Sequence, residues 1–275
     1  MKFTKKRRQG QSYLWIVDRI VITVALAGAF IRFGNFVNSE IIGKPTGSDY
    51  GVVFGRVAEE RLEKAVEDVN IVIHTAALKQ VPVIEYNPFE AIKTNVQGSQ
   101  NLVEACLKKD VEFALAIGTD KAVSPFNTYG ATKLLMERLF VSANYHKGAH
   151  KTKFACVRYG NVLGSRGSII PKFIEQIISG NKITITDPNM TRFNITIDQA
   201  LDLIFRVIKN AVGGDVHIPK LDAFKVGDVK DVLLDLMGCK NEEERIPVRI
   251  GEKFHEILLS IIQKFIIFHI LLIFF

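Results

Sequence analysis

Short apolar runs alternate along the middle of the chain with longer segments whose apolar residues recur every three or four positions. The runs at 70–77 and 113–119 are rich in β-branched and small apolar residues, which is typical of buried strands. Residues 88–109 and 128–146 carry apolar side chains at helical spacing. Apolar strands that alternate with helices predict a parallel sheet joined by crossover helices.

The same alternation continues downstream. A strand is expected to begin at residue 153, and a helix is expected over 169–180, where Gly180 ends the apolar pattern. We therefore predict an α/β fold for residues 56–256, with a small substrate-binding region at about 161–256.

Both ends of the chain depart from this alternation. Residues 20–31 are apolar all round, but they are fewer than the roughly 20 needed to span a bilayer, and extension to 14–31 brings in Asp18 and Arg19. Residues 257–275 are also apolar. We expect both ends to be helical, and membrane contact through 14–31 or 257–275 is one interpretation. For the tail, a non-native extension such as a frameshift product is favoured, because polar side chains in a spanning helix are costly.

Composition narrows the class of partner. The 275 residues carry a net charge of +7, and most of the excess lies in one cluster, formed by Lys2, Lys5, Lys6, Arg7 and Arg8. The rest of the chain is near neutral, so we expect no nucleic-acid partner. The cluster is either a solvated tail or the cytoplasmic flank of a membrane segment. Three cysteines without metal-ligand spacing indicate buried thiols in a reducing compartment, so no metal is expected and a cytoplasmic location is predicted.

One short stretch concentrates reactive side chains. Thr119, Asp120 and Lys121 lie at the carboxyl end of a predicted strand, where parallel sheets place their ligand sites. Tyr129 and Lys133 lie four residues apart on a predicted helix and therefore share one face. A nearby ammonium lowers the pKa of a phenol, which would make Tyr129 a general base toward a sugar hydroxyl, with Thr119 bonded to the same hydroxyl.

The preceding strand ends in small residues. Ala76 and Ala77 would let a cofactor approach the backbone, and Asn95 lies in the helix between the two strands. Each of these residue types also occurs on ordinary helices and loops, so the pattern gains its meaning from the segments around it.

Five segments occur in the order found in a known family: TAALKQVPVIEYNPFEAIKTNVQGSQNLVEAC, TDKAVSPFNTYGATK, RYGNVLGSRGSIIPKF, MTRFNITIDQA and RIGEKFHE. They resemble the nucleotide-sugar 4,6-dehydratases of polysaccharide biosynthesis. The nearest type is the inverting UDP-N-acetylglucosamine 4,6-dehydratase, an extended short-chain dehydrogenase/reductase with a Rossmann-like fold. The resemblance covers about 56–256.

The resemblance implies a reaction and roles for the residues. Tyr129 would take the proton from the C4 hydroxyl while NADP takes the hydride. Lys121 would remove the C5 proton, and Asp120 would protonate the departing C6 hydroxyl. Lysine after the aspartate, where retaining relatives carry glutamate, implies inversion at C5.

The resemblance also implies binding residues and partners. The cofactor would contact Ala76, Ala77, Lys79, Asn95, Tyr129 and Lys133. The UDP-sugar would contact Lys79, Asn161, Arg166, Arg192 and Glu252. Arg192 suits the diphosphate through bidentate pairing, although a surface salt bridge is the plainer interpretation of it. The family also implies a homo-oligomer.

The chain departs from the family at its start. No G-x-G-x-x-G turn occurs in the sequence, so the first βαβ unit is expected to be missing, the sheet truncated and NADP binding weak. Residues 12–54 instead resemble prolipoprotein diacylglyceryl transferase, through Arg32, Gly34, Asn35, Asn38 and Glu40. The chain is therefore interpreted as three parts: 1–55, 56–256 and the apolar tail 257–275. Gly118 and Asn194 also depart from the family, which usually carries serine and an aromatic residue there.

Several functions stay open. The first is the dehydratase, and the second is a nucleotide-sugar epimerase, which would need no acid such as Asp120 for a C6 hydroxyl. The third is an inactive fusion or truncation product, which the missing phosphate turn favours. A diacylglyceryl transferase is disfavoured because most of that enzyme is absent.

Overall fold

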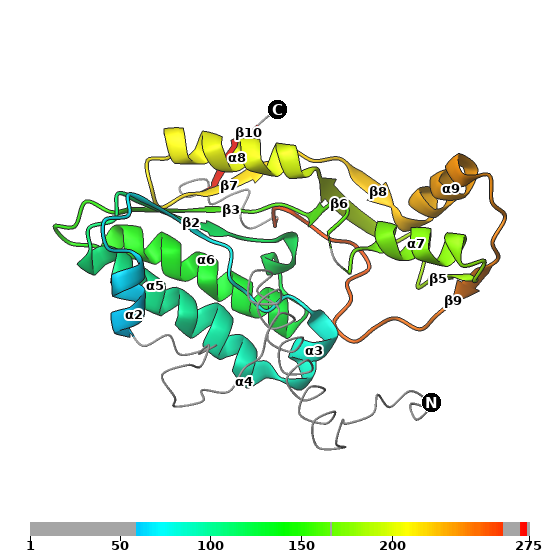
Figure 1. Ribbon diagram of the computed structural model, residues 1–275, viewed down its shortest axis with the longest axis horizontal. Coiled ribbons are helices and arrows are strands. Elements are labelled where there is room, and N and C mark those ends of the chain that lie inside the picture. The colour runs from blue at the N-terminus through cyan, green and yellow to red at the C-terminus, as the bar shows by residue number, and fades with distance from the viewer. Residues whose placement is uncertain (1–58, 166, 261–269, 274–275) are drawn as a thin grey trace, which may run out of the picture. The chain divides into compact units, whose positions relative to one another are not determined.

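The computed structural model describes residues 59–165, 167–260 and 270–273 (Figure 1). The helix expected over 14–31 and the side chain of Arg166 therefore lie outside the described residues. The chain divides between Ile42 and Gly43, and every described residue belongs to the second unit, 43–275. The boundary at residue 55 stays a prediction.

A parallel sheet forms the centre of the described chain, as predicted. Its five strands run in the order β1 (Ile71–His74), β2 (Phe113–Ile117), β3 (Lys153–Val157), β7 (Val216–Pro219) and β10 (Ile270–Ile273). All four pairings are parallel. The α/β, Rossmann-like class expected from the sequence is confirmed.

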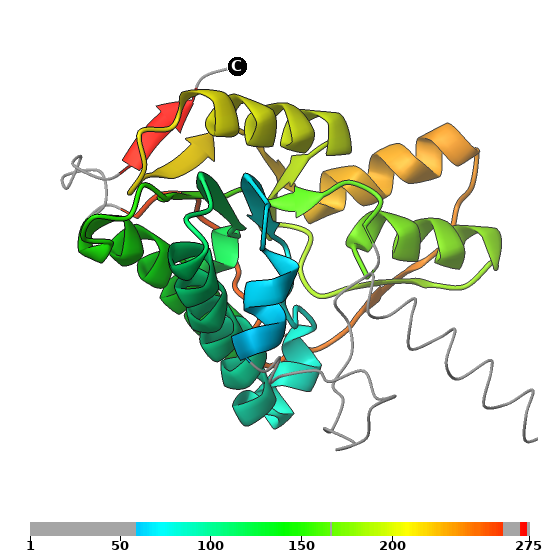
Figure 2. The ribbon, with the colours of Figure 1, turned by 60° about the vertical axis from the view of Figure 1, so that its left-hand side comes forward.

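Helices cover both faces of this sheet (Figures 1 and 2). On one face lie α2 (Glu59–Ala65), α5 (Gly98–Lys108) and α6 (Thr128–His146), and on the other lies α8 (Ile197–Asn210). Strand β2 shows the two-residue alternation that packs both layers. Ala114 and Ala116 face the cluster that contains Met136 and Phe140 of α6, whereas Leu115 faces the α8 side.

The helix expected over 88–109 is built from three consecutive pieces. These are α4 (Pro88–Ala91), the π-helical segment η1 (Ile92–Gln97) and α5. The short helix α3 (Val81–Tyr86) precedes them. A π-helical turn displaces the residues within it from regular helical positions, and here it contains Asn95, which is fully buried.

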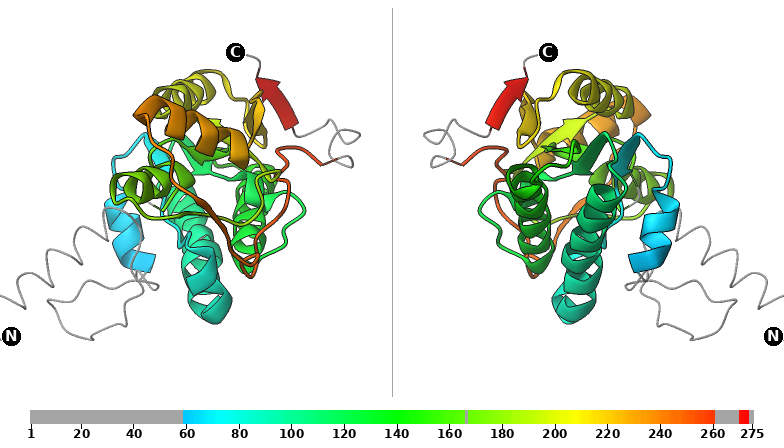
Figure 3. Two further views of the ribbon diagram at one scale, coloured as in Figure 1. Left: turned by 90° about the vertical axis from the view of Figure 1, so that its right-hand side faces the viewer. Right: turned by 90° about the vertical axis from the view of Figure 1, so that its left-hand side faces the viewer.

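Apart from α8, β7 and β10, the elements after residue 160 form a smaller layer beside the carboxyl end of the sheet (Figure 3). It contains two small sheets, one of β4 (Asn161–Val162), β6 (Thr191–Ile195) and β8 (Ala223–Lys225), the other of β5 (Ile183–Ile185) and β9 (Glu243–Arg245). Helices α7 (Ile169–Ile178) and α9 (Val226–Met237) pack there around Phe173 and Met190. The expectation of a substrate-binding role for this region stays a prediction.

One edge of the main sheet differs from expectation. The tail was expected to be helical, but Ile270–Ile273 forms strand β10, which pairs in parallel with β7. The edge of β7 offers unpaired backbone N–H and C=O groups, and a short apolar run beside it can bond to them when it is extended as a strand. At the other edge, β1 has β2 as its described neighbour, and Ile71 and Ile73 are 45% and 42% exposed. Within the described residues, no helix is long and apolar enough to cross a membrane.

Candidate active site

The residues Thr119 to Lys121 leave the carboxyl end of β2 in a single 3-10 turn, η2 (Asp120–Ala122). Thr119 is extended and caps this turn, its side chain accepting from the backbone N–H of Lys121. The backbone N–H of Asp120 donates to the carbonyl of Tyr159 at 3.0 Å, which fixes the turn against the segment after β3. The turn therefore lies where open parallel sheets bind ligands, as predicted.

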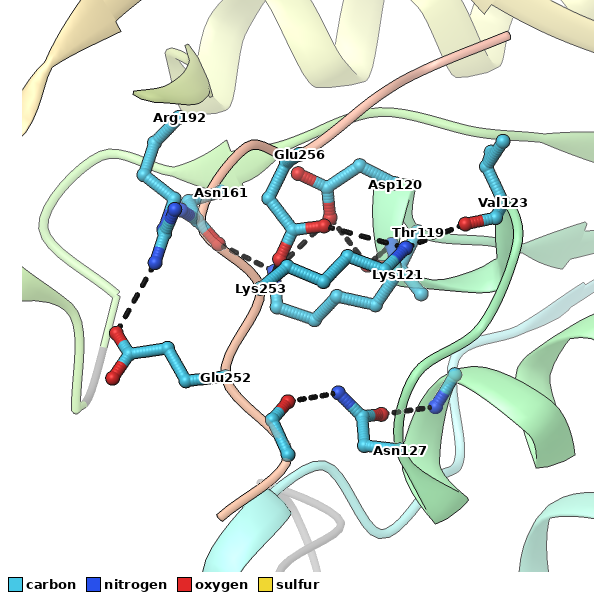
Figure 4. Close-up of polar contacts among 12 residues, drawn as sticks. Thr119, Asp120, Lys121, Val123, Asn127, Asn161, Arg192, Glu252, Lys253 and Glu256 are labelled. Carbon is cyan, nitrogen blue, oxygen red and sulfur yellow. Dashed lines mark hydrogen bonds and ion pairs between the residues drawn. The ribbon is translucent and has the colours of Figure 1, made fainter. Parts of the chain in front are cut away.

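Asp120 and Lys121 form an ion pair at this turn. Asp120 is fully buried, and Lys121 Nζ donates to Asp120 Oδ1 at 3.0 Å and to Asn161 Oδ1 at 3.2 Å (Figure 4). The Lys121 side chain is 21% exposed. An acid and an amine are thus held in contact at the border of the main sheet and the smaller layer, and Asn161, predicted to bind substrate, joins them.

Tyr129 reaches the same turn from helix α6. Asn127 caps this helix by accepting from the backbone N–H of Gly130 at 2.7 Å. A Cβ at Gly130 would lie 2.2 Å from the carbonyl oxygen of Lys121, so only glycine lets α6 approach the turn this closely. Tyr129 is hydrogen-bonded to Thr119, and burial raises the pKa of Tyr129, with the negative charge of Asp120 acting in the same direction.

The expected effect of Lys133 on Tyr129 is wrong for this arrangement. Lys133 is buried, and its Nζ donates to Met136 Sδ at 3.1 Å, one turn along the same helix. Burial lowers the pKa of Lys133 to about 8, opposed by the nearby Glu137. The ammonium is therefore directed along α6 and does not lower the pKa of the phenol, which burial and Asp120 raise.

Asn95 holds the loop that follows β1. Its Oδ1 accepts from the backbone N–H of Leu78 at 2.7 Å, and its Nδ2 donates to the Leu78 carbonyl at 2.9 Å and to Thr132 Oγ1 at 3.0 Å. The loop is thereby fixed against α6. Within it Ala77 is buried, while Ala76 and Lys79 are exposed. Cofactor contact by these residues stays a prediction, and the direct contacts of Asn95 are with the loop and the helix.

Arg192 and Glu252, both predicted to bind substrate, bind each other. Arg192 Nη2 lies 3.1 Å from Glu252 Oε1, and Arg192 Nη1 donates to the Phe254 carbonyl at 3.0 Å. The side chains of Arg192 and Glu252 are 11% and 26% exposed, so the ion pair is part-buried. Both residues approach the site, one from β6 and the other from the segment after residue 250 (Figure 4).

Residues 251–256, which we call the strap, close one side of the site. Asn127 Nδ2 donates to the Gly251 carbonyl at 2.7 Å, and Lys253 Nζ donates to the Val123 carbonyl at 2.6 Å (Figure 4). Glu256 is buried, with Oε1 3.8 Å from Lys121 Nζ. Sequence reasoning selected only Glu252 from this segment, although the RIGEKFHE motif contained Lys253 and Glu256 as well.

Comparison with known proteins places most of the chain in one family. Residues 44–265 match the family described as polysaccharide biosynthesis protein. The chain is 45% identical over 203 residues to an inverting UDP-N-acetylglucosamine 4,6-dehydratase of Campylobacter jejuni, covering 74% of this chain and 60% of that protein. It is 41% identical over 199 residues to a UDP-glucose 4-epimerase of Rickettsia rickettsii, covering 72% and 58%. The chain thus spans about 60% of the length of these relatives.

Solved structures agree with this fold. The X-ray structure of Pen from Bacillus thuringiensis matches with a TM-score of 0.71 and 42% identity, covering 74% of this chain and 65% of that one. A UDP-glucose 4-epimerase of Thermus thermophilus in complex with NAD matches with a TM-score of 0.65 over 80% of each chain. At 22% identity the second match shows the fold alone.

The comparisons also bear on the start of the chain. The family match begins at residue 44 and so includes the last part of the segment 12–54. The comparisons give no support to the resemblance of that segment to prolipoprotein diacylglyceryl transferase. The match ends at residue 265, beyond the strap, and it therefore contains every described residue of the candidate site. The chain belongs to the polysaccharide biosynthesis protein family.

Proposed function

We propose that this chain is a nucleotide-sugar-modifying enzyme, and that its reaction is the 4,6-dehydration of UDP-N-acetylglucosamine with inversion at C5. The observation that carries the proposal is the contact between Lys121 Nζ and Asp120 Oδ1, at 3.0 Å, beside Tyr129. Elimination of water across C5 and C6 needs a base at carbon and an acid at the leaving oxygen. This pair supplies both within one hydrogen bond.

The pair can begin and end the elimination in the same state. Transfer of one proton from Lys121 Nζ to Asp120 Oδ1 converts the ion pair into a neutral amine and a carboxylic acid. The amine then takes the proton from C5 while the carboxylic acid gives its proton to the C6 hydroxyl, which leaves as water. Lys121 is again an ammonium and Asp120 again a carboxylate, so charge and protons balance.

Epimerisation is the second candidate, because a relative at 41% identity is named UDP-glucose 4-epimerase. Inversion at C4 alone needs no proton donor at C6 and no base at C5. The full burial of Asp120 in contact with Lys121 favours dehydration, since a buried acid–amine pair without a chemical role is costly to the fold.

The nicotinamide end of a dinucleotide fits the residues on α6. Lys133 is buried, and within the described residues Met136 Sδ is the acceptor that its Nζ contacts, so it retains N–H donors that could bind ribose hydroxyls. When bound, the cofactor would supply the hydride acceptor for oxidation at C4 and would return the hydride to C6 after water has left, while C5 gains a proton from solvent. Tyr129, bonded to Thr119, would bind the C4 hydroxyl. To accept the hydroxyl proton it would have to act as the phenolate, with its own proton already released to solvent. The family resemblance favours NADP, and the absence of a G-x-G-x-x-G turn leads us to expect weak binding.

The substrate would lie along the strap. Arg192 would bind the diphosphate after exchanging part of its contact with Glu252 for phosphate oxygens, which guanidinium groups bind through two parallel hydrogen bonds. Lys79 and Arg166 are proposed as further UDP-sugar contacts. The homo-oligomer, the cytoplasmic location and membrane contact through 14–31 or 257–275 stay predictions.

The test is an assay of the full chain with UDP-N-acetylglucosamine and excess NADP in deuterated water. We expect a product that has lost water and carries deuterium at C5. Lys121→Met should lower its formation by about 10²–10⁴-fold. Lys182→Met, at a largely exposed lysine paired with Glu242, is the matched control and should have no effect. An epimer without loss of water would overturn the dehydration in favour of epimerisation, and no product from the unaltered chain would favour the inactive fusion product.

A further inference from the structure

Lys121 lies beside two buried carboxylates that come from distant parts of the chain. Asp120 contacts its Nζ at 3.0 Å, and Glu256 Oε1 lies 3.8 Å from the same atom. The side chains of Asp120 and Glu256 are 0% and 4% exposed. Figure 4 shows Glu256 on the strap and Asp120 on the turn after β2, with both carboxylates on the same side of Lys121.

The environment of Glu256 is unfavourable for a carboxylate. Its Oε2 has no hydrogen-bond partner within the described residues, and Lys253 Nζ lies 3.9 Å from it. Burial raises the pKa of Glu256, and the charge of Asp120 acts in the same direction, whereas Lys121, Lys253 and Arg192 oppose this. A buried, incompletely bonded carboxylate costs stability, so packing alone does not explain this residue.

The strap nevertheless fixes Glu256 firmly. Its backbone N–H donates to the Thr191 carbonyl at 3.3 Å, and Lys253 is bonded to the Val123 carbonyl at 2.6 Å. Two residues further on, Arg158 Nη1 donates to the Leu258 carbonyl at 3.0 Å. The backbone is therefore held on both sides of Glu256, and the side chain is directed at Lys121 by well-bonded backbone.

We propose that Glu256 is a positioning residue that keeps the Lys121 amine in place while Asp120 exchanges its proton with the substrate. The inference rests on the proposed dehydration. When Asp120 turns its proton toward the C6 hydroxyl, Lys121 loses its shortest contact. Glu256 and Asn161 then remain as its anchors, and Glu256 neutralises the ammonium that forms when the C5 proton arrives. Glu256 itself neither gives nor takes a proton.

The first test does not depend on turnover. The full-length chain is treated with a trace of an amine-acetylating reagent at neutral pH, and modification of Lys121 is measured by peptide mass spectrometry. Glu256→Gln should increase the labelling rate of Lys121 by roughly three- to tenfold, because one anionic partner has been removed. Glu242→Gln, at an exposed surface ion pair, is the matched control and should leave that rate unchanged.

The second test separates positioning from folding. Glu256→Gln should lower kcat for water elimination with little change in KM, and it should unfold at or above the denaturant midpoint of the unaltered chain because it removes a buried charge. Glu256→Asp should recover part of the loss in kcat because it restores the carboxylate. Unchanged labelling of Lys121 in Glu256→Gln would overturn the inference, whatever its activity. Increased labelling in a chain that never releases water would instead overturn the proposed function and, with it, the role of Glu256 in that reaction.

Discussion

Arg158 and Glu137 form a buried ion pair between helix α6 and the segment that follows strand β3. Arg158 Nη2 lies 2.7 Å from Glu137 Oε2, Nε donates to Glu137 Oε1 at 3.1 Å, and both side chains are 2% exposed. The pair joins helix α6 to the end of strand β3, and Arg158 also holds the Leu258 carbonyl just after the strap. Helix, sheet and strap are therefore tied together at one point.

Removal of one partner should be strongly destabilising. Arg158→Met leaves Glu137 buried without its counter-charge, and such changes cost about 3–5 kcal/mol. Glu137→Gln should cost a similar amount, measured by urea unfolding. The double variant Arg158→Met/Glu137→Met should lose less than the sum of the two single variants, because it leaves no buried charge. Strict additivity would show that the two side chains do not act as a pair.

Gly118 is fixed by packing rather than by backbone conformation. A Cβ there would lie 2.4 Å from Glu137 Oε1 and 2.6 Å from the Val157 carbonyl oxygen. Gly118→Ala should therefore cost about 1–3 kcal/mol in unfolding free energy, and serine, the usual family residue, should cost at least as much. Gly98→Ala is the matched control, since its Cβ would meet the nearest atom at 3.6 Å at the start of a helix, and it should be neutral or stabilising. Equal losses at both positions would rule out the steric explanation.

The location of the site could be predicted from the sequence, but several of its contacts could not. The predicted strand over 113–119 ended at Thr119, just before Asp120, and parallel sheets place ligand sites at such strand ends, so the position of the turn could be predicted from the local pattern. The direction of the Lys133 ammonium could not be predicted from the sequence. Four-residue spacing puts two residues on one helical face, but a long side chain there can still adopt several rotamers. Lys133 follows its own helix toward Met136.

The contacts between segments that are distant in the sequence could also not be predicted from the sequence. The approach of Glu256 to Lys121 depends on how the strap crosses the end of the sheet, which no local period encodes. The same holds for β10, whose apolar sequence suits a helix or a strand until the edge of β7 is present to pair with it. Asn95 was selected as a cofactor contact, which stays a prediction, and its bonds to Leu78 could not be predicted because the π-helical segment leaves no recognisable pattern in sequence.

His74 should make the fold sensitive to acid. Its Nε2 lies 2.9 Å from Ser99 Oγ, and because that hydroxyl donates to the Asn95 carbonyl, the ring nitrogen must be the donor. Burial lowers the pKa of His74 to about 3, with Lys133 adding to the effect. Because the unfolded chain binds this proton near pH 6.5, stability is complete above that pH and falls as the pH drops toward 3, by at most about 1.4 kcal/mol per unit.

The measurement is urea unfolding between pH 8 and pH 4. His74→Gln retains a donor for Ser99 and should reduce the slope of stability against pH below 6.5. His146→Gln, at the exposed end of α6, is the control and should keep the slope of the unaltered chain. If His74→Gln retains the full acid sensitivity, the loss of stability originates in other groups.

Lys133 should reduce the stability of the fold at neutral pH. Because burial lowers the pKa of Lys133 to about 8, the unfolded chain binds this proton more tightly than the folded chain does. Stability should therefore rise with pH between about 8 and 10.5, where the folded protein has released the proton and the unfolded chain still holds it. Lys133→Met fills the same buried volume without charge, and its unfolding free energy at pH 7 should be higher by about 1–3 kcal/mol, since one pKa unit corresponds to about 1.4 kcal/mol. That advantage should disappear toward pH 10.5.

The same variant tests the proposed cofactor role of Lys133. If that role is correct, the stabilised Lys133→Met variant should fail to turn over UDP-N-acetylglucosamine. A variant that is less stable at pH 7 and still active would mean that Lys133 is held by favourable contacts and serves the fold rather than the reaction.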